Sequence, residues 1–184
     1  SDTDPSPVFG AGASAGTFSA IPAGLSINTS TGEIDLSTST PGTYTVTNTI
    51  AAVGACAGTT HDEGIEILST DDPSFSYSAA AFCQDEANPV ATISGTLGGT
   101  FSSTVGLVFA DAATGEIDLS GSTPGTYTIA YATAGSCPAS SDVSVTINDV
   151  EDAGFSYPSA FFCKSEPVNP NATISGTPGG TFSS

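Results

Sequence analysis

The feature that most constrains this chain is an internal repeat. Residues 114–120 match residues 31–37 without a difference, and residues 91–103 recur at 172–184 with a single change. Identical blocks at a nearly constant offset of about 80 residues indicate that one structural unit has been copied in tandem. We therefore expect several small domains and not one large one.

The repeat boundaries predict three parts. A complete repeat occupies residues 71–154, and a first repeat that lacks its opening strand occupies residues 1–70. Residues 155–184 form the N-terminal part of a third repeat. We therefore expect the sequence to begin and to end inside a repeat.

Within the complete repeat, short apolar runs alternate with turn signals. Runs rich in β-branched and aromatic residues predict strands, here at residues 75–82, 90–94, 100–102, 107–109, 116–119, 126–133 and 143–147. Alternation along residues 126–132 sends Tyr127, Ile129 and Tyr131 to one face, and no apolar pattern has helical spacing. Seven short strands in about 80 residues are typical of an immunoglobulin-like, Greek-key β-sandwich, so the expected fold class is all-β.

The charge excludes two kinds of partner. Nineteen acidic residues stand against one lysine and no arginine, which gives a net charge of −18. Nucleic-acid binding needs clustered basic side chains to replace the counterions of phosphate, and docking on anionic lipid needs them as well. No run approaches the roughly 20 apolar residues of a membrane span. We therefore expect neither nucleic-acid binding nor direct membrane insertion.

The four cysteines fall at two repeated positions. Cys83 follows the first predicted strand of the complete repeat and Cys137 precedes its last one, while Cys163 and Cys56 hold these positions in the neighbouring repeats. We predict a disulfide between Cys83 and Cys137 that bridges the two sheets, because a zinc site would need three or four Cys or His close together. In the loop-entropy model, closing a loop of about 55 residues contributes roughly 4 kcal/mol. A disulfide also indicates an oxidising compartment.

Cys56 and Cys163 have no partner within the chain under this scheme. The favoured explanation is that their partners lie outside the chain, in a longer protein. The alternative is donor-strand addition, in which residues 155–163 of one subunit complete the first repeat of the next and an intersubunit Cys163–Cys56 bond forms. Against this alternative, residues 172–182 duplicate a segment that the first repeat already has at about residues 8–18.

Acidic residues gather at the predicted junctions between repeats. They are Asp71, Asp72, Asp149, Glu151 and Asp152. Carboxylate oxygens are the hard ligands that Ca²⁺ prefers, so a weak calcium site that stiffens the junctions is one hypothesis. The alternative is an ordinary solvated acidic surface, since the D-x-D-x-D-G pattern is absent from the sequence. No other cofactor is expected.

The only histidine is a poor candidate for catalysis. His61 lies beside Asp62 and Glu63, and the complete repeat has Ser140 and Ser141 near this position instead. A catalytic triad requires a histidine held between a nucleophile and a carboxylate. We therefore expect His61 to be an ordinary exposed residue and the protein not to be an enzyme.

Two triplets match the N-x-S/T pattern for N-glycosylation, at Asn28 and Asn171. Such triplets are common by chance in threonine-rich sequence, so both asparagines are weak candidates for modification.

The repeated motifs carry a resemblance to a known class of protein. The pattern runs F-S-Y, F-C, P-x-A-T-I-S-G, G-G-T-F-S, T-G-E-I-D-L, S-T-P-G-T-Y-T and V-x-V-T-I in this order through the complete repeat. It resembles the immunoglobulin-like repeats of giant bacterial surface adhesins, in particular those exported by type IX secretion in gliding and biofilm-forming bacteria. The resemblance implies an extracellular filament at the cell surface, with neighbouring repeats or identical subunits as partners.

Three function classes remain open on the sequence alone. The first is a fibre or adhesin stalk, in which the repeats supply length and stiffness and support surface adhesion. The second is a module that binds a glycan or a surface, and the third is an S-layer-like lattice. The first is favoured because the copies agree at turn and core positions, and because we expect the tyrosines to be buried and no aromatic cluster to be exposed.

Overall fold

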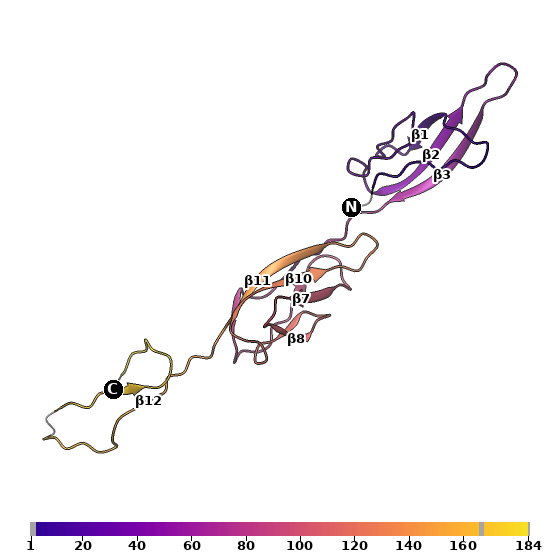
Figure 1. Ribbon diagram of the computed structural model, residues 1–184. Helices are drawn as coiled ribbons and strands as arrows, with labels where there is room; N and C mark the ends of the chain where they lie inside the picture. Colours follow the sequence, from indigo (N-terminus) through magenta and orange to yellow (C-terminus); the bar gives the residue numbers. More distant parts are fainter. Residues whose placement is uncertain (1–2, 166–167, 184) are drawn as a thin grey trace. The chain divides into compact units, whose positions relative to one another are not determined.

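A computed structural model describes residues 3–165 and 168–183 of the chain (Figure 1). Every regular element in these residues is a β-strand, which confirms the all-β prediction. The chain divides into two compact units, Ser1–Asp71 with Ser136–Pro138, and Asp72–Gly135 with Ala139–Ser184. None of the described residues lies in a helix that could cross a membrane.

The second unit contains the complete immunoglobulin-like β-sandwich. Its strands are β4 (Phe75–Ser76), β5 (Ala81–Cys83), β6 (Thr92–Ile93), β7 (Thr100–Ser103), β8 (Val108–Asp111), β9 (Glu116–Asp118), β10 (Gly125–Ala132) and β11 (Ser140–Asn148). One sheet has the order β5-β11-β10-β7, of which β11, β10 and β7 are labelled in Figure 1. The strand pairs β4-β6 and β8-β9 form separate small sheets. The short pair β12 (Phe155–Ser156) and β13 (Thr173–Ile174) follows along the chain.

The core of the second unit follows the predicted alternation. Ile129 and Tyr131 of β10 are fully buried, as are Ile117 and Leu119 around β9 and Val145 of β11. Burying each such side chain stabilises the fold by about 1.5–3 kcal/mol. The single strand predicted at residues 75–82 is not observed. This run instead forms two short strands, β4 and β5, which belong to different sheets.

The first unit is built on the same hairpin but has fewer strands. β1 (Thr17–Ile21), β2 (Gly42–Ile50) and β3 (Thr59–Ile67) form one antiparallel sheet in the order β1-β2-β3 (Figure 1). Gly42 pairs with Ile67 as Gly125 pairs with Ile147, so β2 and β3 correspond to β10 and β11. Among the described residues no strand precedes β1, and β3 therefore pairs with β2 alone.

The repeated S-T-P-G-T-Y block has a structural explanation in both units. The Tyr127 hydroxyl donates a hydrogen bond to the carbonyl of Thr123 at 2.6 Å, and Tyr44 makes the same bond to Thr40 at 2.7 Å. A tyrosine that bonds back to the backbone a few residues upstream is a known corner of immunoglobulin-like sandwiches. The block therefore forms the same tyrosine corner in both units. Its two tyrosines, Tyr44 and Tyr127, are buried as predicted.

The repeated T-G-E-I-D-L block depends on a glycine with a left-handed backbone. Gly115 has a φ of 72°, and a Cβ placed there would lie 2.8 Å from Ala91 and 2.9 Å from the Phe101 ring. Gly32 repeats this arrangement against Phe18 in the first unit. Only glycine adopts this turn at no steric cost, which accounts for its presence in both copies.

Candidate functional site

The strand register places Cys83 and Cys137 at opposite ends of β11. β5 runs parallel to β11 and pairs Cys83 with Asn148, the last residue of that strand. Cys137 lies three residues before Ser140, the first residue of the strand. Eight residues of strand span about 26 Å, and the adjoining segments recover at most about 16 Å. The two Cα atoms are therefore at least about 10 Å apart, whereas a disulfide needs less than about 7 Å.

The structure consequently does not contain the predicted Cys83–Cys137 bridge, and all four cysteines are free thiols. The prediction assumed that residues 75–82 form one strand that ends near the last loop. In the structure this run switches from the sheet of β6 to the edge of β11, which carries Cys83 to the far end of the unit. Cys56 and Cys163 are exposed, and Cys83 and Cys137 are half-buried.

Cys83 has an environment that disfavours the thiolate. Burial raises the pKa of its thiol, and the nearby carboxylates of Glu86, Asp85 and Glu151 raise it further. Because the thiolate is the reactive form, Cys83 is less reactive than an ordinary exposed cysteine. This environment does not suit a catalytic nucleophile.

The first unit contains an open groove where the second unit has a closed core. The groove has a volume of about 780 Å³ and lies between the face of β2 and β3 and the N-terminal segment. Its apolar lining includes Phe9, Phe18, Ile34, Ile65 and Ile67. We define this feature as the β3 groove. The sequence pattern did not predict this groove, although the absence of an opening strand from the first repeat was a signal that could have indicated it.

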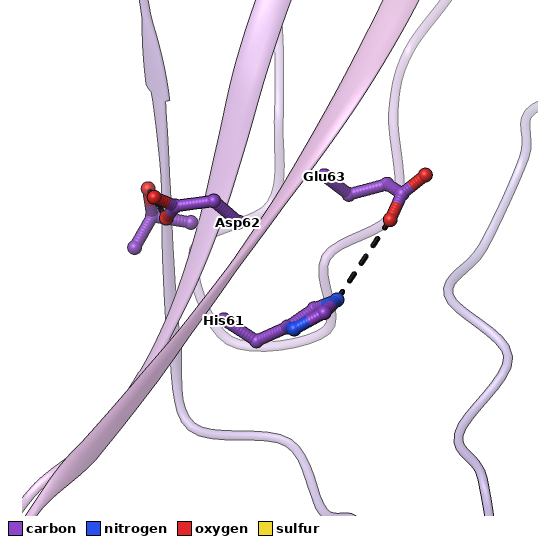
Figure 2. Close-up of polar contacts among 4 residues, drawn as sticks. His61, Asp62 and Glu63 are labelled. Carbon is purple, nitrogen blue, oxygen red and sulfur yellow. Dashed lines mark hydrogen bonds and ion pairs between the residues drawn. The ribbon is translucent and has the colours of Figure 1, made fainter.

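His61 is one of the residues that line the β3 groove. Figure 2 shows His61 and Glu63 on one side of β3 and Asp62 on the other, as expected for alternating strand residues. The His61 Nε2 atom lies 3.7 Å from the Glu63 carboxylate, and both side chains are exposed. Asp62 instead accepts a hydrogen bond from the Thr47 hydroxyl at 2.7 Å. An exposed pair of this kind contributes little to stability, and it provides no activated nucleophile.

The acidic residues proposed for calcium include two that cap turns. The Asp72 carboxylate accepts hydrogen bonds from the Ser74 amide and hydroxyl, and these bonds lower its pKa. Asp152, at the equivalent position, accepts from the Gly154 amide at 2.8 Å. Asp149 accepts from the amide of Val150.

The geometry of a metal centre is not found in the part of the chain that the structure describes. Across residues 3–165 and 168–183, no three His, Cys, Asp or Glu side chains are arranged to hold a metal ion. A calcium role for the acidic residues at the predicted junctions stays a prediction.

The two predicted glycosylation sites are both exposed. The Asn28 side-chain oxygen accepts hydrogen bonds from the amides of Ser30 and Thr31 at 3.0 and 3.1 Å. Asp111 takes the same position in the second unit and bonds to Ala113. A turn role thus explains Asn28 without modification, whereas Asn171 stays an untested candidate.

A group of exposed aromatic side chains departs from the expected surface. Phe155, Tyr157 and Phe162 are each about half exposed, and Phe161 is 88% exposed. Their counterparts in the complete repeat include the buried Phe75 and Phe82. The expectation that no aromatic cluster is exposed is therefore wrong for the segment that contains β12.

Comparisons with known proteins identify no family. No protein-family model matches the sequence, and no curated protein is significantly similar to it. Solved structures that resemble it include mouse cadherin-23 EC22-24, with a TM-score of 0.45 and 15% identity over 88% of this chain and 65% of that chain. Human CDH23 EC21-23 has a TM-score of 0.41 and 12% identity, over 88% of this chain and 69% of that chain. Protocadherin gamma B2 extracellular cadherin domains 3-6 have a TM-score of 0.42 and 15% identity, over 88% of this chain and 48% of that chain.

These likenesses are distant. The chain spans about two thirds of the cadherin-23 structures and about half of the protocadherin structure. At such identities and scores they carry no conclusion about activity, ligand or partner.

Proposed function

We propose that this chain is a structural segment of an extracellular bacterial fibre or adhesin stalk, in which tandem sandwiches give length and stiffness and support adhesion at the cell surface. The observation that carries the proposal is the placement of Cys83 and Cys137 at opposite ends of β11. The retained corner and turn blocks support it, because they maintain the fold of each copy. The resemblance to bacterial surface adhesins supports the bacterial and extracellular assignment.

The cysteine placement suits connections along a fibre. Neither Cys83 nor Cys137 can reach the other within one folded unit, so a disulfide made by either would join the unit to a different repeat or chain. In such a bond two thiols lose two protons and two electrons to an oxidant, for example oxidised glutathione, which is reduced to two thiols. Oxidising extracellular compartments allow bonds of this kind to persist.

The experiment is oxidation of the full chain followed by disulfide mapping. The chain is incubated with oxidised glutathione and digested with chymotrypsin, since a single lysine leaves trypsin little to cleave. We expect mass spectrometry to find strand-end cysteines (Cys83, Cys163) joined to loop cysteines (Cys56, Cys137) of other molecules. Electron microscopy should show particles that grow in length only.

Two outcomes would contradict the proposal. An intrachain Cys83–Cys137 bond as the main product would mean that the unit rearranges to staple itself. Growth in two dimensions would instead support a lattice protein.

A binding module is the second candidate, and one observation favours it. The exposed aromatic side chains Phe155, Tyr157, Phe161 and Phe162 are of the kind that contact sugars or proteins. Binding of the full chain to a glycan array, lost on replacing Tyr157 with alanine, would support this alternative over a purely mechanical role.

A further inference from the structure

We propose that residues 72–84, with strands β4 and β5, act as a mechanical clamp that resists force applied along the chain through the second unit. We call these residues the clamp segment. All of the contacts that form the clamp lie within residues 72–148. The inference deepens the proposed stalk function and rests on it for its biological meaning, because a stalk that supports adhesion has to bear load.

The first half of the clamp segment is attached to the sheet of β6. β4 pairs with β6 through Phe75 and Ser76, and the Phe75 ring is buried in the core. Next to this pair, the Thr96 amide donates a hydrogen bond to the Asp72 carbonyl at 2.7 Å, and the Asp72 amide donates to the Thr96 hydroxyl at 3.0 Å. Pulling β4 out of this sheet therefore breaks hydrogen bonds and exposes an aromatic ring to water.

The second half of the clamp segment is attached to β11, which belongs to the other sheet. β5 runs parallel to β11, and its Phe82 is buried in the core. Just before β5, the Thr146 amide donates to the Ala80 carbonyl at 2.9 Å. Just after β5, the Gln84 amide donates to the Asn148 carbonyl at 3.1 Å. The parallel pair is therefore closed by a hydrogen bond at each of its ends.

The parallel direction determines how this pair carries a load. The clamp segment enters beside the start of β11, where the Ser141 hydroxyl donates a hydrogen bond to the Pro73 carbonyl at 2.6 Å. The chain leaves the sandwich after Asn148, at the other end of β11. A force that pulls these two points apart acts along the strands in opposite directions, so the bonds between β5 and β11 bear it together. Bonds loaded in this way must break together, whereas bonds opened from one end break one at a time.

A side chain reinforces the far end of the clamp. The amide group of the Gln84 side chain donates a hydrogen bond to the Ser122 carbonyl at 2.6 Å. This bond connects the end of β5 to the segment that precedes β10. Gln84 thus holds the clamp by two hydrogen bonds, one from its backbone and one from its side chain.

The change of sheet within the clamp segment gives it a role that the predicted disulfide would have had. A Cys83–Cys137 bridge would have tied the first strand to the rest of the unit covalently. In the structure β4 and β5 are instead bonded to different sheets. Both attachments must break before the clamp segment can be pulled away from the sandwich.

The test is to pull one protein in two directions by single-molecule force spectroscopy. The full chain carries Ser140→Cys as a handle, and its four native cysteines are replaced by serine so that the handle is the only thiol. Ser140 is the exposed first residue of β11. A pull between the two ends of the chain loads β5 and β11 along their length. A pull between the N-terminal end and residue 140 opens the same pair from one end.

We expect the direction of the force to change the unfolding rate of the second unit. At the same force, unfolding should be at least about tenfold slower when the chain is pulled by its two ends, because several hydrogen bonds then have to break together. The length released identifies the unit that unfolds, because each residue adds at most about 3.6 Å. This comparison uses one protein and does not depend on the folding of a further variant.

A substitution at Gln84 tests the clamp itself. Gln84→Pro removes both hydrogen bonds of this residue, and it should speed unfolding about tenfold under the end-to-end pull. It should change the rate little under the other pull, in which Gln84 is loaded last. The matched control is Ser78→Pro, at an exposed position between β4 and β5 where the third repeat has Pro158. The control should leave both rates unchanged, and a urea midpoint for each variant checks that the second unit is folded.

Two outcomes would overturn the clamp. The first is an equal unfolding rate in the two pulling directions. The second is an effect of Gln84→Pro that has the same size in both directions, because this would show a general loss of stability and not a load-bearing role. The stalk function fails separately, when oxidation of the chain gives no particles that grow in length, whatever the unfolding rates are.

Discussion

Tyr131 holds the buried amide of Gly99 in the second unit. The Gly99 N–H donates to the Tyr131 hydroxyl at 2.9 Å, and that hydroxyl donates to the Thr96 carbonyl at 2.8 Å. In the first unit Asn48 takes the position of Tyr131, and its side-chain oxygen accepts from the Gly16 amide at 2.8 Å. Two different side chains thus satisfy the same backbone amide in the two copies.

The Tyr131 contact predicts a measurable loss of stability. Tyr131→Phe keeps the ring but leaves the Gly99 amide and the Thr96 carbonyl without this partner, which costs about 1–3 kcal/mol when the groups are buried. Urea unfolding of the full chain should show a lower midpoint for the second unit. Tyr157→Phe serves as the control, since the Tyr157 ring is half exposed. An unchanged midpoint for Tyr131→Phe would show that water replaces the hydroxyl.

Asp118 predicts how stability responds to acid. Hydrogen bonds from the Gly121 amide and the Ser120 hydroxyl lower the pKa of this carboxyl. A lowered folded-state pKa gives a stabilisation that is complete above the unfolded value near 3.9. It is lost as the pH falls through the lower folded value. Asp118→Asn should therefore reduce the change in urea midpoint between about pH 5 and pH 2, relative to the wild type. Equal pH profiles for the variant and the wild type would refute this role.

The alternating strands were predictable because burial follows from a period of two. Ile117, Leu119, Ile129 and Val145 are all fully buried, as the pattern indicates. The cysteine geometry was not predictable in the same way. Residues 75–82 read as one strand, and a pattern of side chains does not reveal that the chain changes sheets midway or that β5 runs parallel to β11.

Burial of the aromatic residues depends on more than their own sequence. Phe155 and Phe162 have the same local sequence pattern as Phe75 and Phe82, but only the latter are buried. A side chain is buried when the facing strands are present, and this condition lies outside the local sequence. For the same reason the sequence did not reveal the β3 groove, where no strand of the described residues covers Ile65 and Ile67.

Substitution of Asp72 distinguishes a role in capping the turn from a role in binding calcium. Its carboxylate caps the turn at Ser74, so Asp72→Ala should lower the melting temperature by the same amount in EDTA and in calcium chloride. The reason is that the lost hydrogen bonds are independent of metal. The measurement is differential scanning calorimetry of both chains in both buffers. A calcium-induced rise in the melting temperature of the wild type that Asp72→Ala abolishes would establish the metal site instead.

The position of Cys83 predicts that no internal disulfide stabilises the second unit. Because Cys83 and Cys137 lie at opposite ends of β11, Cys83→Ser should leave the urea midpoint of the monomer nearly unchanged under non-reducing conditions. Removing a native disulfide would typically cost 2–5 kcal/mol. If Cys83→Ser lost that much stability, and if the difference from the wild type disappeared when reductant was added to both proteins, the bridge would be shown to form.

The reactivity of Cys83 provides a pH-dependent test of its surroundings. Burial and the neighbouring Glu86, Asp85 and Glu151 raise the pKa of the thiol, so less thiolate is present at a given pH. In a chain whose other three cysteines are replaced by serine, alkylation by iodoacetamide should reach half its maximal rate above the ordinary value near 8.5. Glu86→Gln should shift this midpoint downward by removing a negative charge, whereas Glu33→Gln in the other unit should not. A midpoint at or below the ordinary value would mean that the thiol is neither shielded from water nor close to these carboxylates.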